Sequence, residues 1–136
     1  MTRYWDEKVR FAYTGIRVSN LERSLRFYTQ AMGMKQIGKG EMNHGGIYVS
    51  LKGPKSSQKL ELNYYPPGTR FHERYKSGSE LDHLAFWVTD VDRVYKKLLT
   101  KGAKKAVKPF SEDRYRLAFV EDPDGIWIEL IGTDKR

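Results

Sequence analysis

"ELDHLAFWVTDVDRVY", Glu80 to Tyr95, decides the fold because its pattern of residue types also occurs in "FAYTGIRVSNLERSLRFY", Phe11 to Tyr28. Aligning Tyr13 with His83 sets an offset of seventy residues, and the positions that follow agree in type. The matching pairs are Ile16 with Phe86, Val18 with Val88, Ser19 with Thr89, Asn20 with Asp90 and Leu21 with Val91. The agreement predicts one strand-then-helix unit that occurs twice in the chain.

Each copy carries helix signals directly after its strand. Asn20 and Asp90 are N-cap residue types. Glycines follow each apolar pattern and are typical helix ends, at Gly33 and Gly102. The apolar residues at helical spacing are Leu21, Leu25 and Tyr28 in the first copy and Val91, Tyr95 and Leu98 in the second.

Strand-like stretches complete each copy. "KLELNYY", Lys59 to Tyr65, and "IWIELIG", Ile126 to Gly132, place Glu61 and Glu129 at nearly the same offset as the first landmark. Turn residues at Gly45-Gly46, Gly53-Pro54 and "EDPDG" separate further strands. These are expected at about 35–40, 45–51, 104–109 and 115–121. The order is βαβββ twice, in one α+β domain, 1–136, with modules at about 10–66 and 80–132.

Composition and charge limit the function. The chain has 39% hydrophobic and 31% charged residues, no cysteine and no apolar run of membrane-spanning length, and its start, "MTRYWDEKVR", lacks a signal-peptide pattern. We therefore expect a soluble, cytoplasmic protein without disulfides or thiolate ligands, and no membrane partner. The net charge of +8 is spread along the chain and comes without a nucleic-acid reading motif, so it predicts anionic small substrates rather than nucleic acid.

Strand alternation separates apolar from polar faces. Leu84, Phe86 and Val88 share a face that should pack on a helix, as do Thr14, Ile16 and Val18, Leu60 and Leu62, and Ile128 and Leu130. The opposite faces carry Tyr13, Gly15 and Arg17; Glu61, Asn63 and Tyr65; His83, Ala85 and Trp87; and Trp127, Glu129 and Ile131. If the two modules face each other, Glu61, His83, Glu129 and Tyr13 line one cavity.

Two carboxylates about 4 Å apart repel by about 4 kcal/mol at the effective dielectric of proteins. A divalent metal would offset this repulsion, and a protonated His83 or a proton shared between the glutamates would do so as well. Such a site has perturbed acidity, which is typical of functional sites.

The chain resembles the vicinal oxygen chelate superfamily, which includes glyoxalase I, extradiol dioxygenases, and fosfomycin and bleomycin resistance proteins. The resemblance rests on "YTGIRVSNLERSLRFYTQAMGM", "KLELNYY", "LDHLAFWVTDVD" and "LAFVEDPDGIWIELIG". It implies a strongly curved mixed sheet, a homodimer and a divalent metal, Zn, Ni, Mn or Fe. Glu61, His83 and Glu129 match three of the four metal ligands of proteins similar to glyoxalase I, and Tyr13 occupies the position of the fourth, a histidine.

The resemblance also suggests roles for individual residues. Glu129 is expected to be the general base, leaving the metal to abstract the proton, with Glu61 as the alternative base. Tyr13, a phenol with a pKa of about 10, is expected to bond a water or substrate rather than a metal. Arg17, Asn63, Tyr65 and Trp87 are expected to bind substrate. Tyr65 stands where glyoxalase I has an asparagine, so use of a thiol cofactor stays open.

Other residues have two interpretations. His44 and His72 fall in predicted loops and are either surface residues or substitutes for the missing ligand. Trp87, Tyr65 and Trp127 either line a substrate pocket or fill it as core residues. Arg114 and Arg116 clamp an anionic substrate or protect a sheet edge.

The favoured function is a metal-dependent lyase or isomerase acting on a small carbonyl substrate. The alternatives are a non-catalytic binding protein like the bleomycin resistance proteins, a transferase of the fosfomycin resistance type, and a dioxygenase.

Overall fold

The computed structural model describes residues 8–53, 55–122 and 125–135. These residues form two compact units. The first unit is Tyr13–Asp82, and the second joins the residues up to Ala12 with those from His83 onward. The boundaries therefore fall inside the first and fifth strands. Predicted turn residues Pro54, Pro123 and Asp124 lie outside the described residues.

The first unit is a four-stranded sheet with one α-helix, in the strand order β2-β3-β4-β1. Strands β1 and β4 pair in parallel, and the other pairs are antiparallel. Its elements are β1 (Val9–Arg17), α1 (Leu21–Arg26), β2 (Lys35–Glu41), β3 (Ile47–Lys52) and β4 (Lys59–Tyr64).

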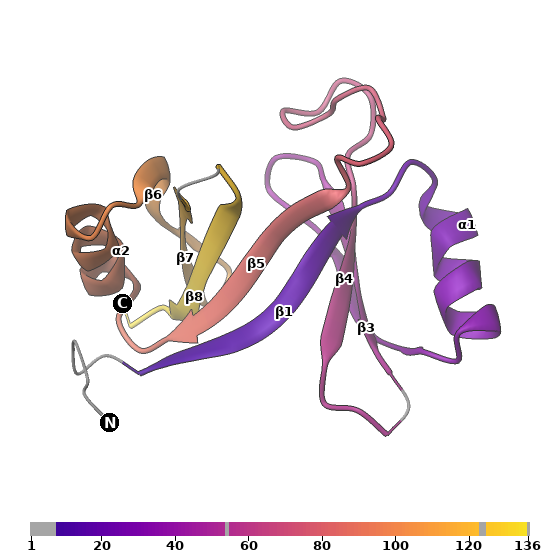
Figure 1. Cartoon of the computed structure of the whole chain (residues 1–136), viewed down its shortest axis with the longest axis horizontal. Helices are drawn as coiled ribbons and strands as arrows, with labels where there is room; N and C mark the ends of the chain where they lie inside the picture. The colour runs from indigo at the N-terminus through magenta and orange to yellow at the C-terminus, as the bar shows by residue number, and fades with distance from the viewer. Residues whose placement is uncertain (1–7, 54, 123–124, 136) are drawn as a thin grey trace. The chain divides into compact units, whose positions relative to one another are not determined.

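The second unit repeats this arrangement in the order β5-β8-β7-β6, with β5 and β8 parallel. Figure 1 shows its helix against one face of these strands. Its elements are β5 (Leu81–Val88), α2 (Val91–Thr100), β6 (Lys104–Glu112), β7 (Tyr115–Glu121) and β8 (Trp127–Thr133). The predicted α+β class and the two βαβββ modules are confirmed.

The helices begin where their caps predict. The Arg23 amide donates to Asn20 Oδ1 at 3.0 Å, and the Arg93 amide donates to Asp90 Oδ1 at 3.1 Å. The first helix departs from expectation because it continues past Arg26 as a π-helical turn, Phe27–Ala31. The Met32 amide there reaches back five residues to the Phe27 carbonyl. Within the described ranges, no helix has the length and hydropathy to cross a membrane.

Each unit has its own core, on the face that alternation predicts. In the first unit Val18, Val49, Leu51 and Leu62 are buried beneath the side chains of α1. In the second unit the buried residues are Val88, Val91, Val94, Tyr95, Ala118, Val120 and Leu130. Because these side chains occupy one face of each sheet, the polar residues at alternate positions lie on the other face.

Gly132 on β8 leaves no room for a side chain. A Cβ atom built there would lie 2.6 Å from the Val88 carbonyl oxygen and 3.1 Å from Val91 Cγ2. We expect Gly132→Ala to lower the free energy of unfolding by about 1–3 kcal/mol, measured by chemical denaturation, because backbone must shift. Gly38→Ala is the matched strand control, since its Cβ would approach only Ser50 Cβ at 4.0 Å. Equal losses in both variants would contradict the steric account.

Candidate functional site

His83 and Glu129 meet inside the second unit. They lie on neighbouring parallel strands, β5 and β8, where Ala85 is paired with Glu129. His83 is 5% exposed and Glu129 is 8% exposed, and His83 Nε2 lies 3.9 Å from Glu129 Oε2. This distance is too long for a hydrogen bond. Two ligands that each bind one ion at about 2.1 Å lie up to about 4.2 Å apart, so the pair fits two ligands of one metal.

Aromatic rings surround this pair. The Phe119 ring lies edge-on to the His83 ring, with centroids 6.2 Å apart, and the Trp127 ring lies 5.4 Å from Phe119. Trp127 is therefore packed beside the candidate site rather than in the helix-side core. The second tryptophan, Trp87, is half-buried and has its ring 6.0 Å from that of Tyr115.

Glu61 is held by Asn63 in the first unit. Both residues are on β4, and Asn63 Nδ2 donates to Glu61 Oε1 at 2.8 Å. Asn63 is fully buried and Glu61 is 8% exposed. A hydrogen bond to a carboxylate is stronger than one between neutral groups, so Asn63 orients the glutamate. Among the described residues, Asn63 Oδ1 accepts no hydrogen bond.

The described parts of the chain contain no complete metal site. In residues 8–53, 55–122 and 125–135, no three His, Asp or Glu side chains lie close enough together to hold one ion. The second unit contains a buried imidazole beside a carboxylate, and the first unit contains a separate buried carboxylate with its amide partner. These are nitrogen and oxygen donors of the kind that divalent transition metals accept.

Arg17 is already paired with carboxylates of its own unit. Its Nη2 donates to Asp82 Oδ1 at 3.4 Å, and its Nη1 donates to Glu73 Oε2 at 3.2 Å. The guanidinium also lies 4.9 Å from the centroid of the Tyr65 ring, in a cation–π contact. The expected substrate-binding arginine is thus held in an internal cluster, and its Nε has no partner among the described residues.

Tyr65 belongs to the same cluster. Its hydroxyl donates to Asp82 Oδ2 at 2.8 Å. Burial, followed by the charge of Asp82, raises the pKa of Tyr65 far above its ordinary value, against an opposing effect of Arg17. Tyr65 therefore remains a protonated donor rather than a base. Sequence reasoning missed Asp82, because no local motif marks a residue whose partners lie 17 and 65 positions away.

The remaining histidines lie in loops, as expected, and both contact Tyr65. The His44 ring is 5.9 Å from the Tyr65 ring, and His44 Nδ1 accepts from the Gly46 amide at 3.2 Å. His72 is exposed and donates from Nδ1 to the Tyr65 carbonyl at 2.7 Å. Tyr13 is half-buried on β1. Neither histidine belongs to a group of three possible ligands in the described parts of the chain.

The interpretation of Arg114 and Arg116 as edge protection is wrong. Arg116 is on β7, which pairs with β6 on one side and β8 on the other and so is not an edge strand, and Arg114 lies in the turn before β7. Arg116 instead donates from Nε and Nη2 to both Asp92 oxygens, at 2.8 and 2.9 Å, and lowers the pKa of that carboxyl. Arg114 stacks on Tyr115, with its guanidinium 5.2 Å from the ring centroid.

The model of the Glyoxalase/Bleomycin resistance protein/Dioxygenase superfamily matches residues 10–130. The chain belongs to this superfamily. A probable lactoylglutathione lyase from Synechocystis sp. is 34% identical over 91% of the chain and 95% of its own length. A lactoylglutathione lyase from Neisseria meningitidis serogroup A is 32% identical over 90% of each protein. The predicted superfamily is thereby confirmed.

Solved structures support the fold of this superfamily member. Methylmalonyl-CoA epimerase from Mycobacterium tuberculosis superposes with a TM-score of 0.72 at 21% identity, over 92% of this chain and 88% of the epimerase. At 21% sequence identity, this structural similarity supports a shared fold and not a shared activity. The chain is thus similar in sequence to proteins named as lyases and in fold to a protein named as an epimerase, so the fold alone does not distinguish between these activities.

Proposed function

We propose that this protein is a metal-dependent lyase or isomerase that acts on a small carbonyl substrate. The buried His83–Glu129 pair carries the proposal, because its 3.9 Å spacing suits two ligands of one ion. Curated relatives named lactoylglutathione lyase, at 34% and 32% identity, support it. We also propose that the protein is a homodimer, as the superfamily resemblance implies.

Glu61, His83 and Glu129 would hold the ion, which we expect to be Zn, Ni, Mn or Fe. Among the described residues no three possible ligands lie close together, so binding of one ion by all three residues stays a proposal for the metal analysis below to test. A bound divalent ion would supply Lewis acidity that stabilises negative charge developing on a substrate oxygen.

The residues of the chain would move the proton. Glu129 is the proposed base: its carboxylate would take a proton from the carbon next to the substrate carbonyl and return it to the neighbouring carbon. Glu61 is the alternative base, and the hydrogen bond from Asn63 fixes its orientation. The rings of Phe119 and Trp127 would restrict water around the pair.

The contacts of Arg17 with Asp82 and Glu73 limit how this arginine could bind an anionic substrate. An anionic substrate group would have to displace Asp82 or Glu73 to bind the guanidinium, because both carboxylates already contact it. The net charge of +8 still favours the approach of anions to the protein. We therefore propose a small carbonyl compound and assign Tyr13 and Trp87 as further substrate contacts.

Elemental analysis tests the metal directly, on protein purified without chelator or histidine tag. We expect about one equivalent of a divalent transition metal, lost in Glu61→Gln and in His83→Ala. His72→Ala is the matched control and should keep the metal, because His72 is exposed and bonded to a backbone carbonyl. Wild-type protein that is free of metal and resists reconstitution would overturn the proposal.

A second candidate is a non-catalytic binding protein. The lack of a three-ligand group in the described residues favours it. Trp87 and Trp127, which lie on the polar sheet face of the second unit, would then form the ligand contacts. Ligand binding that is unaffected by a chelator, in protein without metal, would select this function.

A further inference from the structure

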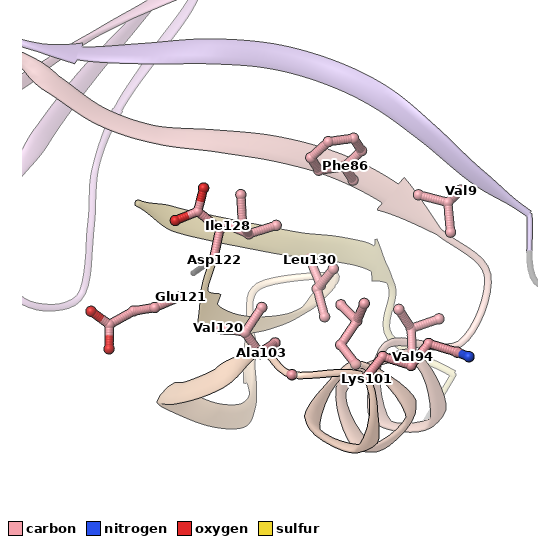
Figure 2. A pocket seen from close by; sticks show the side chains of 12 residues that line it. Val9, Phe86, Val94, Lys101, Ala103, Val120, Glu121, Asp122, Ile128 and Leu130 are labelled. Carbon is pink, nitrogen blue, oxygen red and sulfur yellow. The ribbon is translucent and has the colours of Figure 1, made fainter. Parts of the chain in front are cut away.

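A pocket with a volume of about 400 Å³ opens in the second unit, on the helix side of its sheet (Figure 2). Its walls come from β1, β5, α2, β7 and β8 and from the residues that directly follow α2 and β7. The apolar side chains that form most of it are Phe86, Leu98, Ala103, Val120, Ile128 and Leu130. The volume falls within the range of about 300–1,000 Å³ that small-molecule sites occupy.

This pocket is separate from the candidate metal site. Phe86 and Ile128 line it, whereas His83 and Glu129 occupy positions of opposite parity on the same strands. Alternate side chains of a strand point to opposite faces, so the pocket and the buried pair lie on opposite sides of β5 and β8.

The pocket suits an apolar body. Protein interiors leave few voids larger than a water molecule, and apolar cavities hold water poorly. Val120 and Leu130, which are each 1% exposed, form its floor, while Val9 at its mouth is 40% exposed. A ligand could therefore enter from solvent and cover apolar surface that the described residues leave uncovered.

Opposite charges at the two ends of the pocket favour one orientation of a bound ligand. Figure 2 shows Lys101 beside α2 on one side and the carboxylates of Glu121 and Asp122 on the other. Asp122 already accepts a hydrogen bond from the Ile126 amide at 2.9 Å. Lys101 is exposed, and among the described residues its ammonium makes no ion pair. A ligand with one anionic end would pair with Lys101 and keep that end away from the two carboxylates.

We propose that this pocket binds an aliphatic monocarboxylate. The alkyl chain lies against Phe86, Ala103 and Ile128, and the carboxylate lies on the Lys101 ammonium. The net charge of +8 favours an anionic ligand over a cationic one. The proposal does not depend on the metal site, because it uses none of the residues assigned to it.

An NMR titration of the isotope-labelled full chain with decanoate, below its micelle concentration, tests the proposal. We expect saturable shifts of the amides of Gly102, Ala103 and Val120. Ala103→Leu should weaken binding at least about tenfold by filling the pocket. Lys101→Met should weaken decanoate binding about tenfold and leave decanol binding unchanged, since only the carboxylate pairs with the ammonium.

Lys96→Met is the matched control, because Lys96 is an exposed lysine of α2 that does not line the pocket. This variant should bind decanoate like the wild type. Shifts that do not saturate, or that persist unchanged in Ala103→Leu, would overturn the site. The carboxylate assignment would be overturned if decylamine bound more tightly than decanoate. It would also be overturned if Lys101→Met weakened decanol binding as much as decanoate binding. Metal content, measured in the same samples, distinguishes a failure of the carboxylate-pocket proposal from a failure of the proposed metal-dependent function.

Discussion

Glu129→Gln is expected to lower kcat for a carbonyl substrate by about 10²- to 10⁴-fold, because an amide cannot accept the proton that the carboxylate takes. The change keeps the size of the side chain, which matters because Glu129 is only 8% exposed. The assay should use 2-oxoaldehydes with and without thiols, at saturating metal, and record kcat and KM separately. A lost base lowers kcat with little change in KM.

The metal content of Glu129→Gln distinguishes a lost base from a lost ligand, since the amide oxygen remains able to coordinate. Glu41→Gln, an exposed glutamate at the end of β2, is the control and should retain full activity. Loss of activity in a Glu61→Gln variant that retains its metal, with no loss in Glu129→Gln, would transfer the role of base to Glu61. Unchanged kcat in both variants would overturn general-base catalysis by these residues.

Leu62→Ala should lower the free energy of unfolding by about 2–5 kcal/mol. Leu62 is fully buried in the core of the first unit, with Val18, Val49 and Leu51. Truncation removes buried methyl groups and leaves a cavity that neighbouring strands fill only in part. Chemical denaturation followed by circular dichroism measures the change.

Leu81→Ala is the matched control for this variant. Leu81 is also a strand leucine but is 46% exposed, so its truncation should change the free energy of unfolding by less than about 0.5 kcal/mol. Similar losses in both variants would mean that the core of the first unit is not packed as the structure shows.

The elements that could be predicted rest on signals close together in the chain. Asn20 and Asp90 cap their helices because each side chain bonds an amide three residues ahead. Apolar alternation placed Leu62 and Leu130 in the cores and Glu61 and Glu129 on the opposite faces. The π-helical turn after Arg26 was not predicted, since it differs from an α-helix only in which carbonyl the Met32 amide reaches.

The composition and pattern of the chain were sufficient for its superfamily, its twofold βαβββ order and the residue types of its candidate metal ligands. Other features could be seen only in the tertiary structure. These are the 3.9 Å distance between His83 and Glu129, the ion pairs of Arg17 with Asp82 and of Arg116 with Asp92, and the pocket beside α2. The reason is physical. Backbone preferences and side-chain alternation act over a few residues. Contacts between residues tens of positions apart depend on how strands pair and how side chains fill space between them.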